Sequence, residues 1–185
     1  MKIIGVILAR MDSSRLPNKA LREIRGVPLL GYVIKRAQLI PELTKVCIAT
    51  TSREVDQPIA DYGQMQGIPV YRGDCNNVLQ RFYEAASAFD ADYALRLNGD
   101  SPFVDKGLIQ QGISICRDNE VDLVSNIYGS RTFPYGISVE IIKMSAMKKM
   151  YAYELTKEHK EHITKFFYDH SADFNIYGLT SRKEY

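Results

Sequence analysis

Residues 3–21, IIGVILARMDSSRLPNKAL, contain the most informative pattern in the chain. The run from Ile3 to Leu8 is apolar and rich in β-branched side chains, which is typical of a buried strand in a parallel sheet. The loop that follows offers cations, hydroxyls and backbone N–H groups, from Ala9, Arg10, Ser13, Ser14, Arg15 and Lys19. Such groups just past the carboxyl end of a strand suit a polyphosphate ligand. A solvated basic turn is the alternative.

Strand-like and helix-like segments alternate from this stretch to residue 126. The apolar patterns predict strands at residues 45–50, 69–72, 92–97 and 122–126, and helices at residues 29–39, 55–66, 78–89 and 108–116. This alternation predicts an α/β fold with a doubly wound, mostly parallel sheet. Further along, we expect strands at residues 138–142 and 174–179, and helices that begin at Ser145 and Glu158.

Composition narrows the classes of protein that the chain can belong to. With 185 residues, 45% of them hydrophobic and 25% charged, we expect a single domain over residues 1–185. A net charge of +2 without a Lys/Arg block argues against nucleic acid as a partner. Three distant cysteines indicate no disulfide or metal framework and favour a cytoplasmic location. The N-terminal apolar run is too short for a signal peptide, and no stretch reaches transmembrane length, so no membrane partner is expected.

Asp100 is the strongest single candidate for a functional side chain. It follows a predicted buried strand, and Gly99 lets the backbone turn sharply before it. An acid at that place lies in the crevice where α/β sheets bind ligands, and it can hold Mg²⁺ against a nucleotide phosphate. The alternative is an ordinary aspartate in an Asn-Gly-Asp turn.

Several motifs resemble those of a known family. LARMDSSRLPNKAL is similar to A-R-x-x-S-[ST/K]-R-L-P-x-K-x-L, the first motif of the cytidylyltransferases that activate acidic sugars. These are the CMP-Kdo and CMP-acylneuraminate synthetases, and the spore-coat-polysaccharide branch is the most similar. Further along, RLNGDSPFVD resembles R-x-x-G-D-x-P-[LF]-[IV]-D, and the family's R-G-x-x-x-[DN]-V-L-x-R, P-x-G-x-x-[VA]-E and E-H-[VI]-T motifs have counterparts beginning at Arg72, Pro134 and Glu161.

The resemblance implies a nucleotide-diphospho-sugar transferase (GT-A-like) fold and a CTP-dependent nucleotidyltransferase. In the implied reaction, the anomeric hydroxyl of an acidic sugar attacks the α-phosphorus of CTP and expels pyrophosphate, and the implied pathway is surface polysaccharide biosynthesis. The implied catalytic residues are Arg10, Arg15, Lys19 and Asp100, with Asp100 as the Mg²⁺ ligand. The implied nucleotide-binding residues are Ala9, Ser13, Ser14, Arg72, Arg96 and Asn98, and the implied acceptor-binding residues are Glu140 and His162.

Alternatives remain for most of these residues. Arg72 is equally well read as a surface charge at a strand end, and Arg81 as part of a solvated helix face. Glu140 can be an ordinary strand acid, and His162 can contact a partner subunit instead of the acceptor. Asp105 can cap the helix that follows it. His159 is expected on a helix surface.

The resemblance also implies a homodimer, with residues 127–170 as a candidate dimerisation or acceptor-binding subregion. The aromatic residues there form an apolar interface or close the monomer's own core: Tyr128, Phe133, Tyr135, Phe166, Phe167 and Tyr168. Relatives carry a later R-x-T-V-D-x-x-x-D segment whose acids hold a second metal, and residues 180–185 contain no such motif. Because this motif is expected to be absent, the chain can alternatively be an impaired or non-catalytic homologue that still binds a nucleotide. A nucleotidyltransferase or glycosyltransferase that uses another nucleotide is a further alternative.

Overall fold

β1 (Ile3–Leu8) is an interior strand of the central sheet. The computed structural model describes residues 1–12 and 16–181, and in this part of the chain the sheet has seven strands in the order β5-β4-β1-β6-β8-β7-β9. The other strands are β4 (Lys45–Thr51), β5 (Val70–Gly73), β6 (Tyr93–Asn98), β7 (Leu123–Ser125), β8 (Glu140–Lys143) and β9 (Ile176–Gly178). After β1 the chain adds β4 and β5 on one side of this strand, and β6 then lies on its other side.

Within this sheet, β8 runs against its neighbours. β1 pairs in parallel with β4 and β6, β4 with β5, and β7 with β9, whereas β8 is antiparallel to both β6 and β7. The carboxyl ends of the parallel strands therefore share one edge, and the amino end of β8 lies at that same edge. This arrangement confirms the predicted α/β fold with a doubly wound, mostly parallel sheet.

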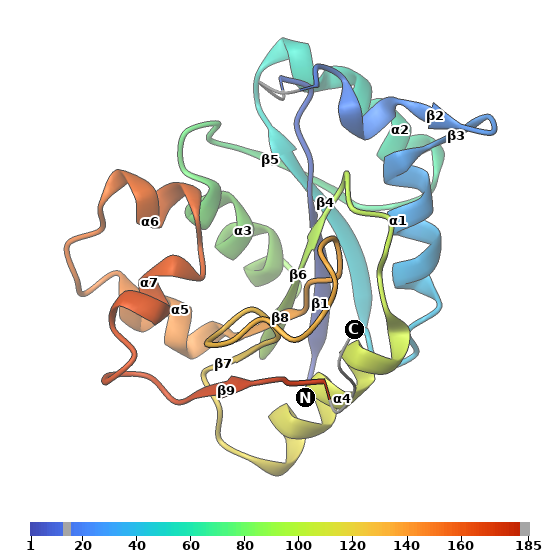
Figure 1. Cartoon of the computed structure of the whole chain (residues 1–185). Coiled ribbons are helices and arrows are strands. Elements are labelled where there is room, and N and C mark those ends of the chain that lie inside the picture. The colour runs from blue at the N-terminus through green and yellow to red at the C-terminus, as the bar shows by residue number, and fades with distance from the viewer. Residues whose placement is uncertain (13–15, 182–185) are drawn as a thin grey trace.

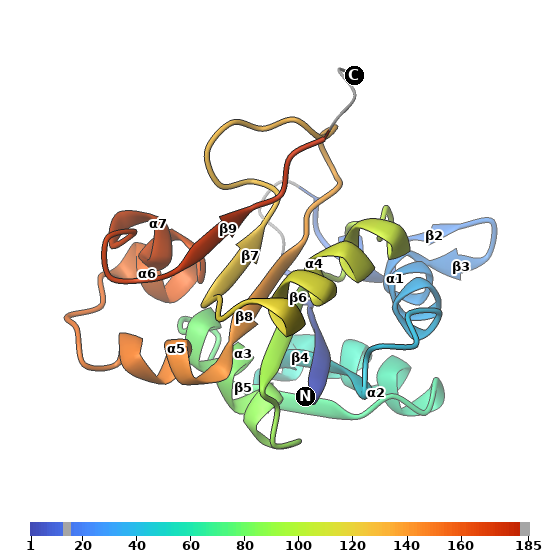
Figure 2. The same ribbon diagram turned by 90° about the horizontal axis from the view of Figure 1, so that it is seen from below.

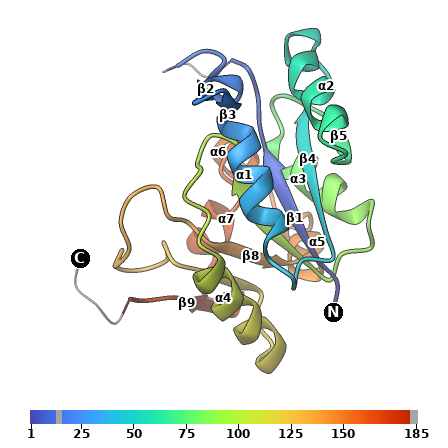
Figure 3. The same cartoon turned by 90° about the vertical axis from the view of Figure 1, so that its right-hand side faces the viewer.

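Helices cover both faces of the sheet (Figures 1 and 2). One face carries α1 (Leu29–Gln38), α2 (Gln57–Met65) and α4 (Lys106–Asp118). Figure 3 shows α1 and α4 in front of the sheet from this side. The opposite face carries α3 (Val78–Ser87), α5 (Met144–Met150), α6 (Lys157–Glu161) and α7 (Lys165–Asp169). Side chains of β1 alternate between the two cores, with Ile3 and Ile7 on the first face and Ile4 and Val6 on the second.

Two local features differ from the sequence-based expectation. A small hairpin, β2 (Glu23–Ile24) with β3 (Val27–Pro28), stands before α1, and its turn places Arg25 and Gly26 at positive φ. The helix expected from Glu158 onward is two short helices, α6 and α7, because the chain leaves helical geometry at His162.

The aromatic residues of the C-terminal part close the monomer's own core. Phe166 and Phe167 are fully buried among the side chains of α3, α5 and the sheet. His159 is buried as well, which corrects the surface position expected for it: its Nδ1 accepts the backbone N–H of Thr156, and its Nε2 lies 3.0 Å from Asp169. Tyr135, by contrast, is almost fully exposed. None of the helices in the described part of the chain has the length and apolar character needed to cross a membrane.

Candidate active site

The loops that follow β1 and β6 lie side by side at the carboxyl edge of the sheet. The N–H of Gly99 donates a hydrogen bond of 2.9 Å to the carbonyl oxygen of Leu8. A Cβ atom at position 99 would lie only 2.9 Å from the Cβ atom of Ala9. The Asn98-Gly99-Asp100 turn can approach the first loop this closely because residue 99 has no side chain.

Lys19 and Asp100 form an ion pair between these two loops. Nζ of Lys19 contacts Oδ2 of Asp100, and the two side chains keep 25% and 34% of their surface exposed. Lys19 opens a single 3-10 turn, η1 (Lys19–Leu21), after Asn18, which has a positive φ of 59°. Asparagine adopts that conformation more readily than most residues. The structure therefore brings together two of the residues that the sequence pointed to.

Both side chains line a cleft of about 350 Å³ at the ends of β1 and β6. This is the place where the strand order reverses, and such crevices bind ligands in open α/β sheets. Ala9, Asn98 and His162 also contribute to the lining. Its charged members are four cations and two carboxylates: Arg10, Lys19, Arg81, Arg96, Asp100 and Glu161. The excess of positive charge favours an anionic ligand.

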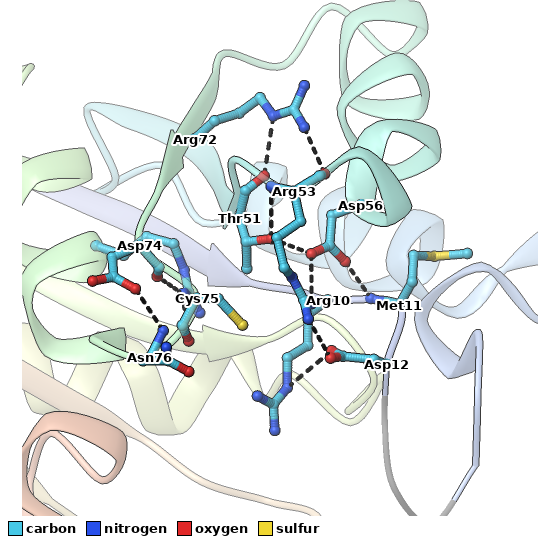
Figure 4. Close-up of polar contacts among 11 residues, drawn as sticks. Arg10, Met11, Asp12, Thr51, Arg53, Asp56, Arg72, Asp74, Cys75 and Asn76 are labelled. Carbon is cyan, nitrogen blue, oxygen red and sulfur yellow. Dashed lines mark hydrogen bonds and ion pairs between the residues drawn. The ribbon is translucent and has the colours of Figure 1, made fainter. Parts of the chain in front are cut away.

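A network of buried and half-buried charges holds the first loop in place (Figure 4). Asp56 is fully buried, and its Oδ1 accepts the backbone N–H of Met11 at 2.6 Å. Its Oδ2 accepts hydrogen bonds from the hydroxyl of Thr51 and from Nη2 of Arg53. Arg53 also binds Asp12 at 2.5 Å, and this contact lowers the pKa of the Asp12 carboxyl. Asp12 is thus neutralised beside the loop. Ser13, Ser14 and Arg15 lie outside the described residues.

Arg72 lies away from the cleft lining. Its Nε donates to the carbonyl oxygen of Thr51 at 3.0 Å, its Nη2 to that of Arg53 at 2.9 Å, and its Nη1 to the side chain of Gln57. These bonds brace the segment between β4 and α2 (Figure 4). Asp105 caps α4, since its Oδ1 accepts the N–H of Leu108 at 2.8 Å.

Glu140 supports the cleft from behind. It faces Arg96 across the β6–β8 pair, and its Oε2 lies 2.5 Å from Nη1 of Arg96. Its Oε1 accepts hydrogen bonds from the hydroxyls of Thr164 at 2.5 Å and Tyr168 at 3.3 Å. Burial and the charge of Glu140 raise the pKa of Tyr168 to about 12. Because both oxygens of this buried carboxylate are occupied, Arg96 reaches the cleft and Glu140 orients it.

Sequence reasoning gave too little weight to Arg81. The solvated position expected for it is wrong, because its side chain is only 2% exposed and lines the cleft. The helical period carried this signal, since Arg81 lies three residues after Val78 and four before Ala85, both on the inward face of α3. Asp56 had no comparable signal, because an acid at the start of a helix normally caps it.

Comparison with known proteins identifies the family. A sequence profile described as cytidylyltransferase matches residues 4–184. The chain belongs to the cytidylyltransferase family. It is therefore a CTP-dependent nucleotidyltransferase, and the resemblance found in the sequence is confirmed.

Individual relatives agree with this assignment. The uncharacterized protein MJ1063 of Methanocaldococcus jannaschii is 31% identical over 97% of this chain and 72% of its own length. The spore coat polysaccharide biosynthesis protein SpsF of Bacillus subtilis is 29% identical over 99% of this chain and 77% of its own length. The 3-deoxy-manno-octulosonate cytidylyltransferase of Acidobacterium capsulatum is 36% identical over 56% of this chain and 42% of its own. A cytidylyltransferase structure from Leptospira borgpetersenii superposes with a TM-score of 0.93 at 26% identity, covering 100% of this chain and 78% of that one.

Proposed function

We propose that this cytidylyltransferase transfers CMP from CTP to the anomeric hydroxyl of an acidic sugar similar to Kdo or sialic acid, in surface polysaccharide biosynthesis. The observation that carries the proposal is the Lys19–Asp100 pair, set in a positively charged cleft at the point where the strand order reverses. The relatives named for acidic-sugar and spore-coat chemistry support the acceptor class.

Asp100 is the side chain proposed to hold a magnesium ion. Among the described residues, no group of three His, Cys, Asp or Glu side chains is arranged to bind a metal. A magnesium ion that arrives with a nucleotide needs only one or two carboxylates, because phosphate oxygens supply further ligands. A half-exposed carboxylate beside a cationic loop fits this requirement. When bound, the ion neutralises charge on the phosphates.

The chain's own residues position the substrates and neutralise the leaving group. The sugar hydroxyl gives up its proton to solvent as its oxygen forms a bond to the α-phosphorus. The bond from this phosphorus to the bridging oxygen breaks, and pyrophosphate leaves with the electron pair and its negative charge. Arg10 and Lys19 line the cleft where that charge appears. Such reactions depend on positioning and electrostatic stabilisation more than on covalent work by the protein. Arg96 and His162 lie on the remaining wall, where the acceptor is proposed to bind.

The test is pyrophosphate release from each nucleoside triphosphate with Mg²⁺ and a panel of neutral and acidic sugars. We expect release only with CTP and an acidic sugar. Lys19→Ala and Asp100→Ala are expected to abolish release while keeping the wild-type circular dichroism spectrum. Near-full activity in either variant would refute the role given to that residue, and release with neutral sugars alone would refute the acceptor class.

A further inference from the structure

Arg81 is a buried cation to which the described residues supply no acidic ion-pair partner. Its side chain is 2% exposed, and its Nη1 donates to the backbone carbonyls of Asp74 and Cys75. Its Nε is buried without a hydrogen-bond partner, and among the described residues no carboxylate forms an ion pair with it. A guanidinium stays charged in proteins, and burial of an unpaired charge is costly. The described residues therefore compensate the charge of Arg81 only in part, through two backbone carbonyls and the unbonded charges of Asp56 and Asp74, and an anionic ligand would complete this compensation.

The acids nearest to Arg81 are engaged elsewhere. Asp56 accepts hydrogen bonds from Met11, Thr51 and Arg53, and Asp74 accepts the backbone N–H of Asn76 at 2.7 Å. Burial lowers the pKa of Arg81, and the positive charge of Arg10 lowers it further, whereas the negative charges of Asp56 and Asp74 act in the other direction.

Arg10 and Arg81 line the same cleft from two different elements. Arg10 comes from the loop after β1, and Arg81 from α3. Nε of Arg10 lies 3.7 Å from Oδ1 of Asp12, and Asp100 and Glu161 also line the cleft. The four cations of the lining still outnumber its two carboxylates, which favours a ligand with several negative charges. A triphosphate matches this requirement better than a single carboxylate does.

Close packing fixes the position of Arg81. A Cβ atom at Gly73 would lie 3.3 Å from Cγ of Arg81 and 2.9 Å from the ring of Tyr71. The absence of a side chain at residue 73 therefore lets the stem of Arg81 lie against β5. A cation held in place before its ligand arrives loses little side-chain entropy on binding.

We propose that Arg81 binds the phosphates of the nucleotide together with Arg10, as a further cationic side chain of the site. This inference rests on the proposed nucleotide site and is independent of the identity of the acceptor. It adds a nucleotide-binding residue from α3 to those of the loops after β1 and β6.

The test compares the affinities of CTP and cytidine by titration calorimetry with Mg²⁺ for the full chain, Arg81→Gln and Arg117→Gln. Arg117 is the matched control, because it is exposed on α4 on the opposite face of the sheet. For Arg81→Gln we expect the Kd of CTP to rise by about tenfold or more, since a charge-assisted hydrogen bond is lost, with cytidine unchanged. Arg117→Gln is expected to match the wild type for both ligands.

Other outcomes would overturn the proposal. Equal weakening of CTP and cytidine would assign Arg81 to bracing the loop at Asp74 and Cys75. Unchanged CTP affinity with a raised KM for the acidic sugar would assign it to the acceptor's carboxylate. If Arg81→Gln does not fold, the same titrations are made with Arg81→Lys. A weaker affinity for CTP with unchanged affinity for cytidine supports the proposal, and equal weakening of both affinities, or no weakening, overturns it. A wild-type chain that binds cytidine as tightly as CTP would instead refute the nucleotide site itself.

Discussion

Two buried carboxylates, Asp56 and Glu140, support the cleft without lining it. Each accepts hydrogen bonds at both oxygens, and each holds one arginine, Arg53 or Arg96. Groups that bind charged ligands need rigid supports of this kind, because a small displacement weakens every contact. At the scale of single residues, the site therefore depends on acids that lie outside the lining of the cleft.

Asp56→Ala tests this support. The substitution leaves the N–H of Met11 and the hydroxyl of Thr51 without their acceptor, and it removes one partner of Arg53. We expect the free energy of unfolding to fall by about 3 kcal/mol in urea titrations, because buried groups become unsatisfied. The matched control is Asp61→Ala on the exposed side of α2, with an expected change within about 0.5 kcal/mol. Equal changes in the free energy of unfolding for the two substitutions would show that Asp56 does not hold the first loop in place.

At the scale of elements, helices lie close to the sheet where glycine faces a strand. A Cβ atom at Gly63 of α2 would lie 2.5 Å from Cγ2 of Val70 and 2.8 Å from Cδ1 of Ile48. Both neighbours are branched side chains on adjacent strands, β5 and β4, and therefore have little freedom to move. This contact sets the distance of α2 from the sheet and so the place of Asp56 at its start.

Gly63→Ala is expected to lower the free energy of unfolding by about 1–3 kcal/mol, because overpacking outweighs the better helix propensity of alanine. Gly107→Ala in the first turn of α4 is the opposite case, since the nearest atom is 3.5 Å away and belongs to Asp105. Here alanine is expected to raise stability by about 0.5–1 kcal/mol. Urea titration of both variants measures the two changes in the free energy of unfolding, which are expected to have opposite signs. A stabilised Gly63→Ala protein would mean that Val70 and Ile48 repack freely.

The elements that sequence could predict are those with a strong apolar period. β4 and β6 were expected within one residue of their observed bounds, because each contains a run of buried residues that is mostly apolar. The hairpin of β2 and β3 was not expected, since strands of two residues carry no period. The break at His162 also escaped prediction, because tertiary contacts such as that of Thr164 with Glu140 place the segment after it.

At the scale of the whole molecule, the cleft joins parts of the chain that are far apart in sequence. Lys19 and Asp100 could be predicted because each follows a recognisable strand end, and parallel strands bring such ends to one edge. The position of Arg72 could not, since it depends on which backbone carbonyls lie within reach of its guanidinium group. A ligand in this cleft touches β1, β6, α3 and the end of α6 together.

Ligand binding across these elements is expected to stabilise the whole fold. CTP at about one hundred times its Kd adds roughly 2.7 kcal/mol, because it binds the folded chain alone. For a chain of this size the gain corresponds to a rise of about 5–10 °C in Tm. Scanning fluorimetry with CTP, UTP, GTP and ATP, each with Mg²⁺ or with a chelator, measures the shift. We expect the full rise only with CTP and Mg²⁺, and a much smaller one for Asp100→Ala. Equal shifts with all four nucleotides would contradict base selection by this cleft, and a shift unaffected by the chelator would contradict the metal role of Asp100.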